Sequence, residues 1–318
     1  MSKHTSFDQR NEQIGLATGR GFITYELTSG IVLYEAHFPV GGANCISLLS
    51  DSNLVALSGD DTPDGFSKQS VVIWDCNNDK VVKTWNVQNP IENLLFRTDC
   101  LVVVHGDQIN FYDCCDFEMT FTTKIPSPSR CCVALVQSNA ISHVAYPSPN
   151  GDCLNIADYH DPGYIIGSLP LAFNKISFFA FDSKGELLAI AVDDAKTVQL
   201  WSVMELRLIA KYKRGFRGAE INSITFDKLS NFFIMSTKKG TMYVYAIPTP
   251  AERNDVNTSK AIRSKFSYEF PKGSNYNYQF DIAGYVITGI TDDGTFKQVR
   301  LDIDHGTVVN VCDRKLEV

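Results

Sequence analysis

Val71-Val72-Ile73-Trp74-Asp75 is an apolar run that ends in an aromatic side chain and an aspartate before a turn. Short runs rich in β-branched and aromatic residues favour β-strands. Comparable anchors, each an aromatic or apolar residue before a turn, recur at intervals of roughly 45 residues. The anchors are Tyr25, Trp74, Tyr112, Ala157, Trp201, Tyr245 and Val299. This period is typical of a four-stranded propeller blade, so seven anchors predict seven blades.

The segments between these anchors support the same fold. Alternating runs are separated by turn signals such as Ser148-Pro149-Asn150-Gly151 and Asp182-Ser183-Lys184-Gly185, and long helical patterns are almost absent. The sequence therefore predicts an all-β protein, a WD40-like seven-bladed β-propeller in a single domain. The expected blades span residues 5–37, 43–87, 91–125, 131–167, 174–212, 220–268 and 275–318. We interpret the anchor aromatics as packing between blades.

The composition excludes several classes of protein. Hydrophobic residues make up 44% and charged residues 20% of the 318-residue chain, as in ordinary globular proteins. The net charge of −7 argues against a nucleic-acid partner, which usually meets a broadly basic surface. Residues 1–13 are polar, and no apolar run approaches the ~18 residues of a membrane-spanning helix. We expect a cytoplasmic protein whose contact with membranes is peripheral.

Signatures of catalysis and metal binding are lacking. The chain has no G-x-x-x-x-G-K-[ST], G-x-S-x-G or H-E-x-x-H motif, and its six histidines are scattered. The nine cysteines include no Cys-x-x-Cys pair, which argues against zinc. Acidic pairs such as Asp193-Asp194 fall at turns, where Asp is favoured for backbone reasons. We predict no enzyme activity, no catalytic residue, no metal site and no cofactor.

One segment is strongly basic. Lys211, Lys213, Arg214 and Arg217 lie within KYKRGFR, which contains no acidic residue, and Lys238-Lys239 form a turn in the next expected blade. In a propeller, the residues after the last strand of one blade lie near the turns of the next, so these charges could meet at one edge of the disk. Such clusters bind phosphate groups. The alternative interpretation is a solvated connection between blades.

Residues 211–247 resemble the signature region of the PROPPIN family, the phosphoinositide-binding WD-repeat propellers. The resemblance rests on Tyr212-Lys213-Arg214-Gly215, Ala219-Glu220-Ile221-Asn222-Ser223 and Ser236-Thr237-Lys238-Lys239-Gly240-Thr241. Residues 6–9 with 21–25, 53–59 with 72–75, and 145–147 are similar to the first, second and fourth blades of that family. The resemblance thus covers most of the chain and agrees with the predicted fold.

The resemblance implies two phosphoinositide pockets on the disk edge. The second pocket would be formed by Arg214, Arg217, Ser236, Thr237, Lys239, Thr241 and Tyr243. The first pocket would retain only Lys213, Ser177, Lys196 and Gln199. Lys213 replaces an arginine of the family motif, and a lysine cannot reproduce bidentate phosphate contacts. We therefore expect the first pocket to be weak or absent.

The resemblance also implies a membrane loop, at about residues 248–265 between the last two strands of the sixth blade. Lys260, Ile262, Arg263, Lys265 and Phe266 are its candidate lipid contacts, and an ordinary exposed loop is the alternative. The implied ligands are phosphatidylinositol 3-phosphate and phosphatidylinositol 3,5-bisphosphate.

The implied role is a peripheral effector on autophagic, endosomal or vacuolar membranes, with an autophagy or trafficking protein bound at the propeller edge. The alternative function is a WD-repeat protein-interaction scaffold whose lipid binding is weak or lost.

Overall fold

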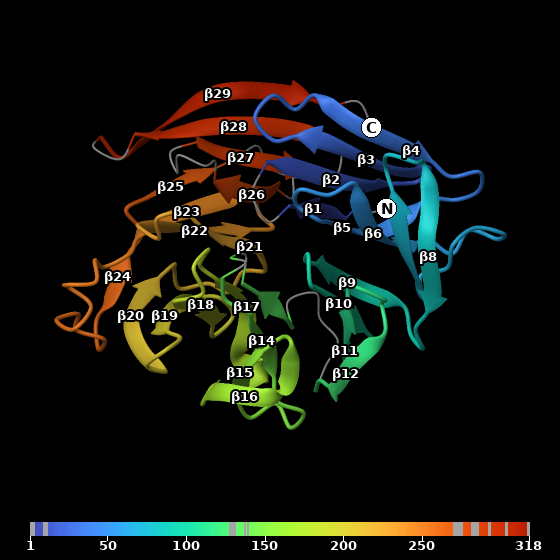
Figure 1. Ribbon diagram of the computed structural model, residues 1–318. Coiled ribbons are helices and arrows are strands. Elements are labelled where there is room, and N and C mark those ends of the chain that lie inside the picture. The colour runs from blue at the N-terminus through green and yellow to red at the C-terminus, as the bar shows by residue number, and fades with distance from the viewer. Residues whose placement is uncertain are drawn as a thin grey trace.

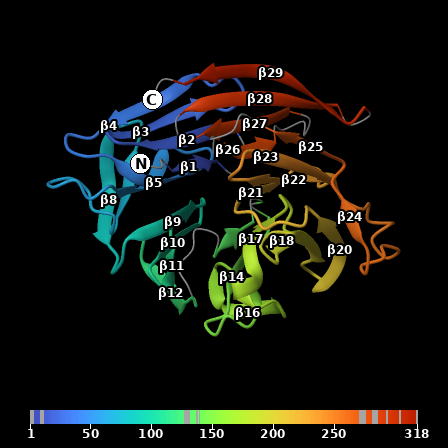
Figure 2. The ribbon, with the colours of Figure 1, turned by 180° about the vertical axis from the view of Figure 1, so that it is seen from behind.

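The computed structural model describes residues 4–8, 12–126, 132–136, 138, 140–269, 276–280, 286–291, 294–302 and 305–316. Their strands form seven sheets arranged around a ring, as Figure 1 and the reverse view in Figure 2 show. The prediction of an all-β, seven-bladed propeller is confirmed.

Each of the first four blades is an antiparallel meander in which consecutive strands are hydrogen-bonded neighbours. Their strands are β1 (Thr5–Phe7), β2 (Gln13–Thr18), β3 (Gly21–Glu26) and β4 (Val32–His37); β5 (Ala43–Leu48), β6 (Leu54–Gly59), β7 (Ser70–Asp75) and β8 (Lys80–Asn86); β9 (Ile91–Phe96), β10 (Cys100–His105), β11 (Gln108–Asp113) and β12 (Met119–Lys124); β13 (Ala134–Leu135), β14 (His143–Pro147), β15 (Leu154–Asp158) and β16 (Asp161–Leu169).

The last three blades follow the same plan, and a short 3-10 turn, η1 (Phe173–Lys175), precedes the fifth. Their strands are β17 (Ile176–Phe181), β18 (Leu187–Val192), β19 (Thr197–Ser202) and β20 (Arg207–Lys213); β21 (Ile221–Phe226), β22 (Phe232–Thr237), β23 (Thr241–Ala246) and β25 (Phe266–Glu269); β26 (Tyr276–Phe280), β27 (Val286–Thr291), β28 (Thr295–Asp302) and β29 (Thr307–Lys315).

The seven anchor residues all lie on the third strand of their blades. In six blades the pairing of this strand with the outermost strand shifts register immediately before the anchor, for example between Ile73 and Trp74 and between Leu200 and Trp201. Such a bulge increases the local twist of an edge strand. The sixth blade lacks this shift, because β25 pairs only with Thr241–Val244 and ends before Tyr245.

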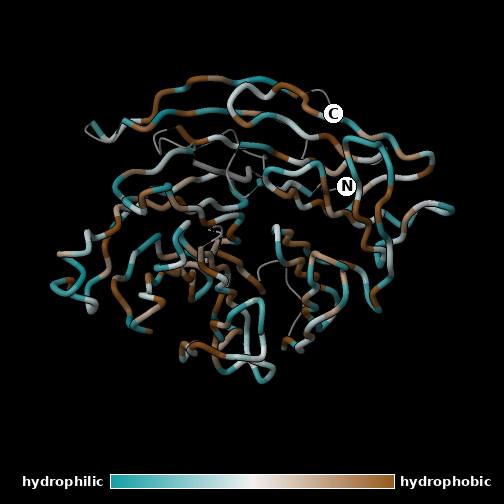
Figure 3. The backbone as a smooth tube through the Cα atoms, viewed as in Figure 1, coloured by the Kyte–Doolittle hydropathy of each residue, from teal (hydrophilic) through white to brown (hydrophobic). Residues whose placement is uncertain are grey.

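The hydrophobic core is divided among the interfaces between blades. Seven clusters of buried residues occupy the seven interfaces, one cluster for each pair of neighbouring blades. In Figure 3 the hydrophobic stretches follow the strands, whereas the connection around β24 is mostly hydrophilic. Each blade therefore depends on both of its neighbours for burial of its faces.

Among the described residues, no strand is shared between the first and the last blade. The first blade contains only β1–β4 and the last only β26–β29, and the two blades lie side by side in Figure 1. Apolar side chains including Tyr25 and Phe296 pack between them. Gln298 donates hydrogen bonds from Nε2 to the carbonyl oxygens of Leu27 and Thr28, at 3.2 and 3.1 Å. Side-chain packing and the hydrogen bonds of Gln298 therefore hold the first and last blades together.

An additional strand extends the fifth blade. Strand β24 (Ala261–Arg263) comes from the connection between β23 and β25 of the sixth blade, and it pairs in parallel with the outer edge of β20. The paired positions are Lys211 with Ala261, Tyr212 with Ile262 and Lys213 with Arg263. Figures 1 and 2 both show this connection at the outer rim. It covers an edge that would otherwise expose unpaired backbone groups.

Candidate functional site

The basic segment forms a fixed connection between the fifth and sixth blades. After β20 the chain turns back onto the hairpin between β18 and β19. The backbone N–H of Arg214 donates to the carbonyl of Lys196 at 3.0 Å, and that of Ala219 donates to the carbonyl of Asp194 at 3.1 Å. These two hydrogen bonds hold both ends of the 214–219 connection at the rim.

The Arg214 side chain reinforces this attachment. Its Nε donates to the carbonyl oxygen of Ala195 at 2.6 Å, and its Nη2 donates to the carbonyl oxygen of Arg217. Asp193, Asp194 and Ala195 have φ values of 54°, 55° and 57°. Left-handed backbone costs an alanine about 1–2 kcal/mol, and hydrogen bonds from a charged donor offset that cost. No described carboxylate pairs with this guanidinium, so three of its five N–H groups remain for a ligand.

Two further cations lie beside this connection with their charges uncompensated. The side chains of Arg217 and Lys239 are exposed, and neither makes an ion pair in the described part of the chain. The turn that carries Lys239 is joined to the connection through Lys238, whose Nζ lies 2.6 Å from Oε2 of Glu220. This hydrogen bond lowers the pKa of the exposed Glu220 carboxyl. Glu220 thus pairs with Lys238 and leaves Arg217 and Lys239 available.

The remaining predicted residues of the second pocket divide into two groups. Thr241 and Tyr243 are partly exposed on β23, and the Arg214 guanidinium lies 6.0 Å from the centre of the Tyr243 ring. Ser236 and Thr237 are 1% and 2% exposed. The Ser236 hydroxyl lies 2.8 Å from that of Ser223, and the Thr237 hydroxyl donates to the Thr241 carbonyl. Their hydroxyls are therefore engaged within the blade and do not face solvent.

The four predicted residues of the first pocket lie in the fifth blade or at its end, and three of their side chains make contacts within the chain. Lys196 Nζ lies 3.6 Å from the Asp194 carboxylate, and the Gln199 side-chain oxygen accepts a hydrogen bond from Trp201 at 3.0 Å. Lys213 Nζ lies 3.8 Å from the centre of the Phe216 ring. Ser177 is partly exposed at an irregularity in the β17–β18 pairing. This group presents fewer free donors than the second.

Two residues of the predicted membrane loop pack against the propeller. Ile262 packs against the core between the fifth and sixth blades, and Phe266 packs against the core between the sixth and seventh. Lys260, Arg263 and Lys265 are exposed. The loop therefore presents cations outward, while its two apolar side chains face the propeller. Sequence reasoning could not foresee this, because the packing partners of both residues are distant in the sequence.

Sequence reasoning also missed Phe216. This residue follows Gly215 in the basic connection and is 83% exposed. The sequence did contain a signal for this exposure. Phe216 is an aromatic residue in a glycine-containing segment without strand periodicity, and such a segment lies outside the cores between blades.

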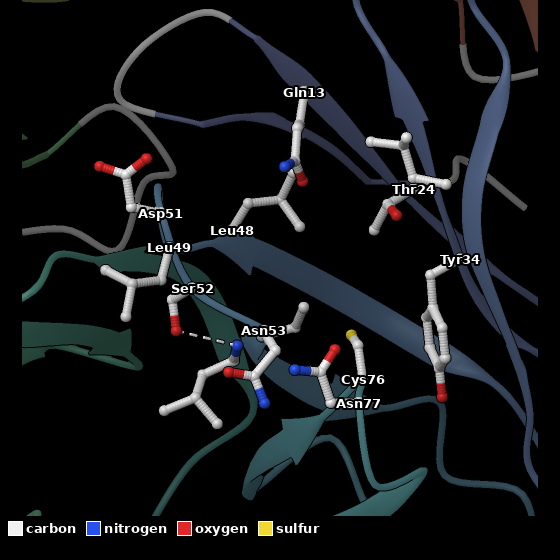
Figure 4. Close-up of a pocket in the computed structure, with 13 residues that line it drawn as sticks. Gln13, Thr24, Tyr34, Leu48, Leu49, Asp51, Ser52, Asn53, Cys76 and Asn77 are labelled. Atoms are coloured by element: carbon white, nitrogen blue, oxygen red, sulfur yellow. Dashed lines mark hydrogen bonds between the residues drawn. The ribbon is translucent and has the colours of Figure 1, made fainter.

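A cavity of about 450 Å³ lies elsewhere, between the first and second blades. Figure 4 shows Tyr34, Asn53, Cys76 and Asn77 at its wall, and the residues that line it include no lysine or arginine. Burial raises the pKa of Tyr34 to about 12, aided by its hydrogen bond to Asp79, and burial likewise raises that of Cys76 to about 12. Because its lining has no lysine or arginine and includes the carboxyl group of Asp51, the cavity suits an uncharged or peptide ligand better than a phosphate.

Neither a membrane span nor a metal cluster is found among the described residues. No described helix is long and apolar enough to cross a bilayer. The described residues also contain no group of three histidine, cysteine, aspartate or glutamate side chains that could hold a metal ion.

Similar proteins were found both by sequence and by structure. No family model matches the chain. Autophagy-related protein 18 of Neosartorya fischeri is 23% identical over 280 residues, which cover 81% of this chain and 63% of that protein. SVP1-like protein 2 of Debaryomyces hansenii is 21% identical over 299 residues, covering 83% of this chain and 69% of that protein. The chain thus spans about two thirds of the length of these relatives.

The structural matches cover nearly the whole ring. Kluyveromyces lactis Hsv2 matches with a TM-score of 0.80 at 15% identity over 99% of this chain and 98% of that chain. Atg21, from a complex of KlAtg21 with the coiled-coil of AgAtg16, matches with a TM-score of 0.83 at 15% identity over 100% of both chains. These matches agree with the seven-bladed fold and with the resemblance of the sequence to PROPPINs. The basic motif that carries this resemblance lies on the connection between the fifth and sixth blades.

Proposed function

We propose that this protein is a PROPPIN and acts as a phosphoinositide-binding peripheral membrane effector. The observation that carries the proposal is the set of exposed cations and hydroxyl donors at the rim between the fifth and sixth blades. Arg217 and Lys239 offer uncompensated charge, Arg214 retains three N–H groups, and Thr241 adds a hydroxyl. A phosphate group carries several acceptor oxygens and is bound by clusters of this kind.

The expected ligands are phosphatidylinositol 3-phosphate and phosphatidylinositol 3,5-bisphosphate. Arg214, Arg217, Lys239, Thr241 and Tyr243 form the favoured pocket, and Ser236 and Thr237 support it from within the blade. The group of Lys213, Ser177, Lys196 and Gln199 contributes little, because it contains no arginine and the ammonium groups of Lys196 and Lys213 already make contacts within the chain. Binding through one pocket is weaker than through two linked pockets, because it lacks the gain in avidity.

The names of the relatives suggest the cellular setting. Similar proteins from Neosartorya fischeri and from Dictyostelium discoideum are both called autophagy-related protein 18. We place this protein in autophagy or in endosomal and vacuolar traffic, as a cytoplasmic protein that binds the membrane surface. The role requires no catalytic step.

A vesicle sedimentation assay tests this function. The Arg217→Thr/Lys239→Thr variant removes two exposed cations that make no ion pair within the described chain, so we expect it to keep its fold. We expect it to lose most binding to vesicles containing phosphatidylinositol 3-phosphate. Lys80→Thr/Lys124→Thr is the matched control, because it makes the same charge change at exposed positions on the second and third blades. Equal binding by both variants and the wild type argues against the proposal.

A protein-interaction scaffold is the second candidate, and the cavity between the first and second blades favours it. Its wall combines apolar side chains such as Leu33 and Leu48 with the amide of Asn53, a mixture that suits a peptide. One structurally similar protein, KlAtg21, was solved in a complex with the coiled-coil of AgAtg16. We propose that an autophagy or trafficking protein binds this chain at the propeller edge. Membrane puncta that persist when phosphoinositide 3-kinase is inhibited identify the scaffold role.

A further inference from the structure

Phe216 is the most exposed aromatic side chain at the basic rim. It is 83% exposed and lies between Gly215 and Arg217, on the connection that carries the proposed phosphate-binding cations. Other apolar side chains are also highly exposed, including Met204 at 94% and Leu229 at 66%. Met204 is followed by Glu205 in a turn that lacks clustered cations. Phe216 is therefore distinguished by its surroundings.

The backbone presents Phe216 rigidly. Hydrogen bonds from Arg214 to Lys196 and Ala195, and from Ala219 to Asp194, fix the chain on both sides of it. The Arg214 side chain also bonds to the carbonyl of Arg217, which spans the residues around Phe216. A side chain held in this way loses little backbone entropy when it is buried against a second surface.

The charges around Phe216 indicate which kind of surface it could contact. Lys213 Nζ lies over the ring at 3.8 Å, and Arg217 and Lys239 are exposed close to the same connection. An aromatic ring surrounded by cations complements an anionic lipid surface, where phosphates meet the ammonium groups and the ring enters the interface. The predicted apolar anchors Ile262 and Phe266 are packed against the blades and cannot take this role without leaving the core.

We propose that Phe216 is a membrane anchor of this protein, inserting at the headgroup level beside the bound phosphoinositide. The inference rests on the proposed lipid-binding function and adds a contact with the bilayer itself. Transfer of a phenylalanine side chain out of water is favourable, and insertion at the interface recovers part of the free energy of complete burial. The expected contribution to vesicle affinity is about tenfold.

Three variants test the anchor. Phe216→Ser is expected to bind phosphatidylcholine vesicles containing phosphatidylinositol 3-phosphate about tenfold more weakly than the wild type. Its affinity for soluble inositol 1,3-bisphosphate should be unchanged, because the phosphate-binding cations remain. Leu229→Ser is the matched control, since it removes an exposed apolar side chain from a turn elsewhere in the sixth blade. Phe216→Trp should show emission that shifts to the blue on vesicles and is quenched by brominated lipids beyond the quenching of wild-type protein.

The outcomes separate the anchor from the lipid-binding function. If Phe216→Ser binds the vesicles as tightly as the wild type does, the anchor is overturned and the proposed lipid-binding function stands. The anchor is likewise overturned if brominated lipids do not quench the tryptophan of Phe216→Trp. That result is the one expected if Phe216 binds a protein partner and does not enter the bilayer. If the wild type binds neither the vesicles nor the soluble headgroup, the proposed function fails and the anchor fails with it.

Discussion

Arg214 serves both the fold and the proposed ligand. Two of its N–H groups donate to carbonyl oxygens, one in the turn between β18 and β19 and one in the 214–219 connection. The other three remain for a phosphate. A substitution of Arg214 therefore changes the shape of the rim as well as its charge. Arg217 and Lys239 are better reporters of ligand binding, because their side chains form no ion pair that the fold requires.

Buried aspartates join neighbouring blades. Asp182 accepts hydrogen bonds from the backbone N–H groups of Glu186 and Leu187, both at 2.9 Å, and from the Ser230 hydroxyl of the next blade at 2.6 Å. Asp8 makes the corresponding bonds between the first two blades, including one from Ser50 at 2.8 Å. These carboxylates link adjacent blades where the backbone does not.

Asp182 should make stability depend on pH. Burial raises its pKa, against the opposing effect of its hydrogen bonds. A raised folded-state pKa means that its stabilising contribution is complete below the unfolded pKa of about 3.9 and is lost as pH rises through the folded pKa. Asp182→Asn carries no charge, and its oxygen can still accept from the two backbone N–H groups, while its NH2 group can donate to the Ser230 hydroxyl in place of the bond that Ser230 now donates. We expect its melting temperature to rise relative to the wild type as the pH increases above about 4.

The control at this position is Asp182→Ala. It leaves two backbone N–H groups and the Ser230 hydroxyl without their acceptor, and it should cost about 2–4 kcal/mol in the free energy of unfolding. A melting-temperature difference between Asp182→Asn and the wild type that stays constant with pH contradicts the assignment.

The side chains that bear on binding show what the sequence could and could not predict. Arg217 and Lys239 were predicted from the basic motif, and they are exposed because they follow strands and occupy turns. The burial of Ser236 and Thr237 was not predicted, because it depends on Ser223 and Thr241 in neighbouring strands. Phe216 was overlooked because exposed aromatics have no periodic signature.

Strand β24 is the element that differs most from its predicted form. The sequence of residues 248–265 indicates a polar loop, yet three of its residues pair in parallel with β20. Local propensity did not indicate this strand, because its stability comes from a tertiary contact of Ile262 with the core. The third strand of each blade, in contrast, was predictable, because it carries its own anchor residue and is followed by its own turn.

Releasing β24 should loosen the outer edge of the fifth blade and leave the ring intact. Ile262→Asp places a charge against the core, so we expect β24 to detach and the backbone amides near Lys211–Lys213 to exchange hydrogen faster. Lys260→Ala, an exposed change in the same connection, should leave the exchange unaltered. If Ile262→Asp does not change exchange in residues 211–213, β24 contributes nothing to the protection of this edge.

The whole molecule has an uneven distribution of charge. Residues 43–169, which include the second to fourth blades, contain 15 acidic and 6 basic residues, whereas residues 170–269 contain 10 acidic and 15 basic. On an anionic surface this distribution attracts the fifth and sixth blades and repels the opposite side. The cavity between the first and second blades would then stay open to a protein partner.

Ring closure is the other property of the whole molecule. Because Gln298 binds the carbonyls of Leu27 and Thr28, Gln298→Glu brings a carboxylate against two oxygens and should destabilise the protein more than Gln298→Ala. We expect the alanine variant to cost about 1 kcal/mol in urea unfolding and the glutamate variant at least twice that. Equal losses contradict closure through this amide.

The structure of the protein bound to inositol 1,3-bisphosphate tests the central claim most directly. We predict one headgroup at the rim between the fifth and sixth blades, with its phosphate oxygens within hydrogen-bonding distance of Arg214, Arg217 and Lys239. A headgroup bound only elsewhere, with these three side chains unmoved and facing solvent, contradicts the account.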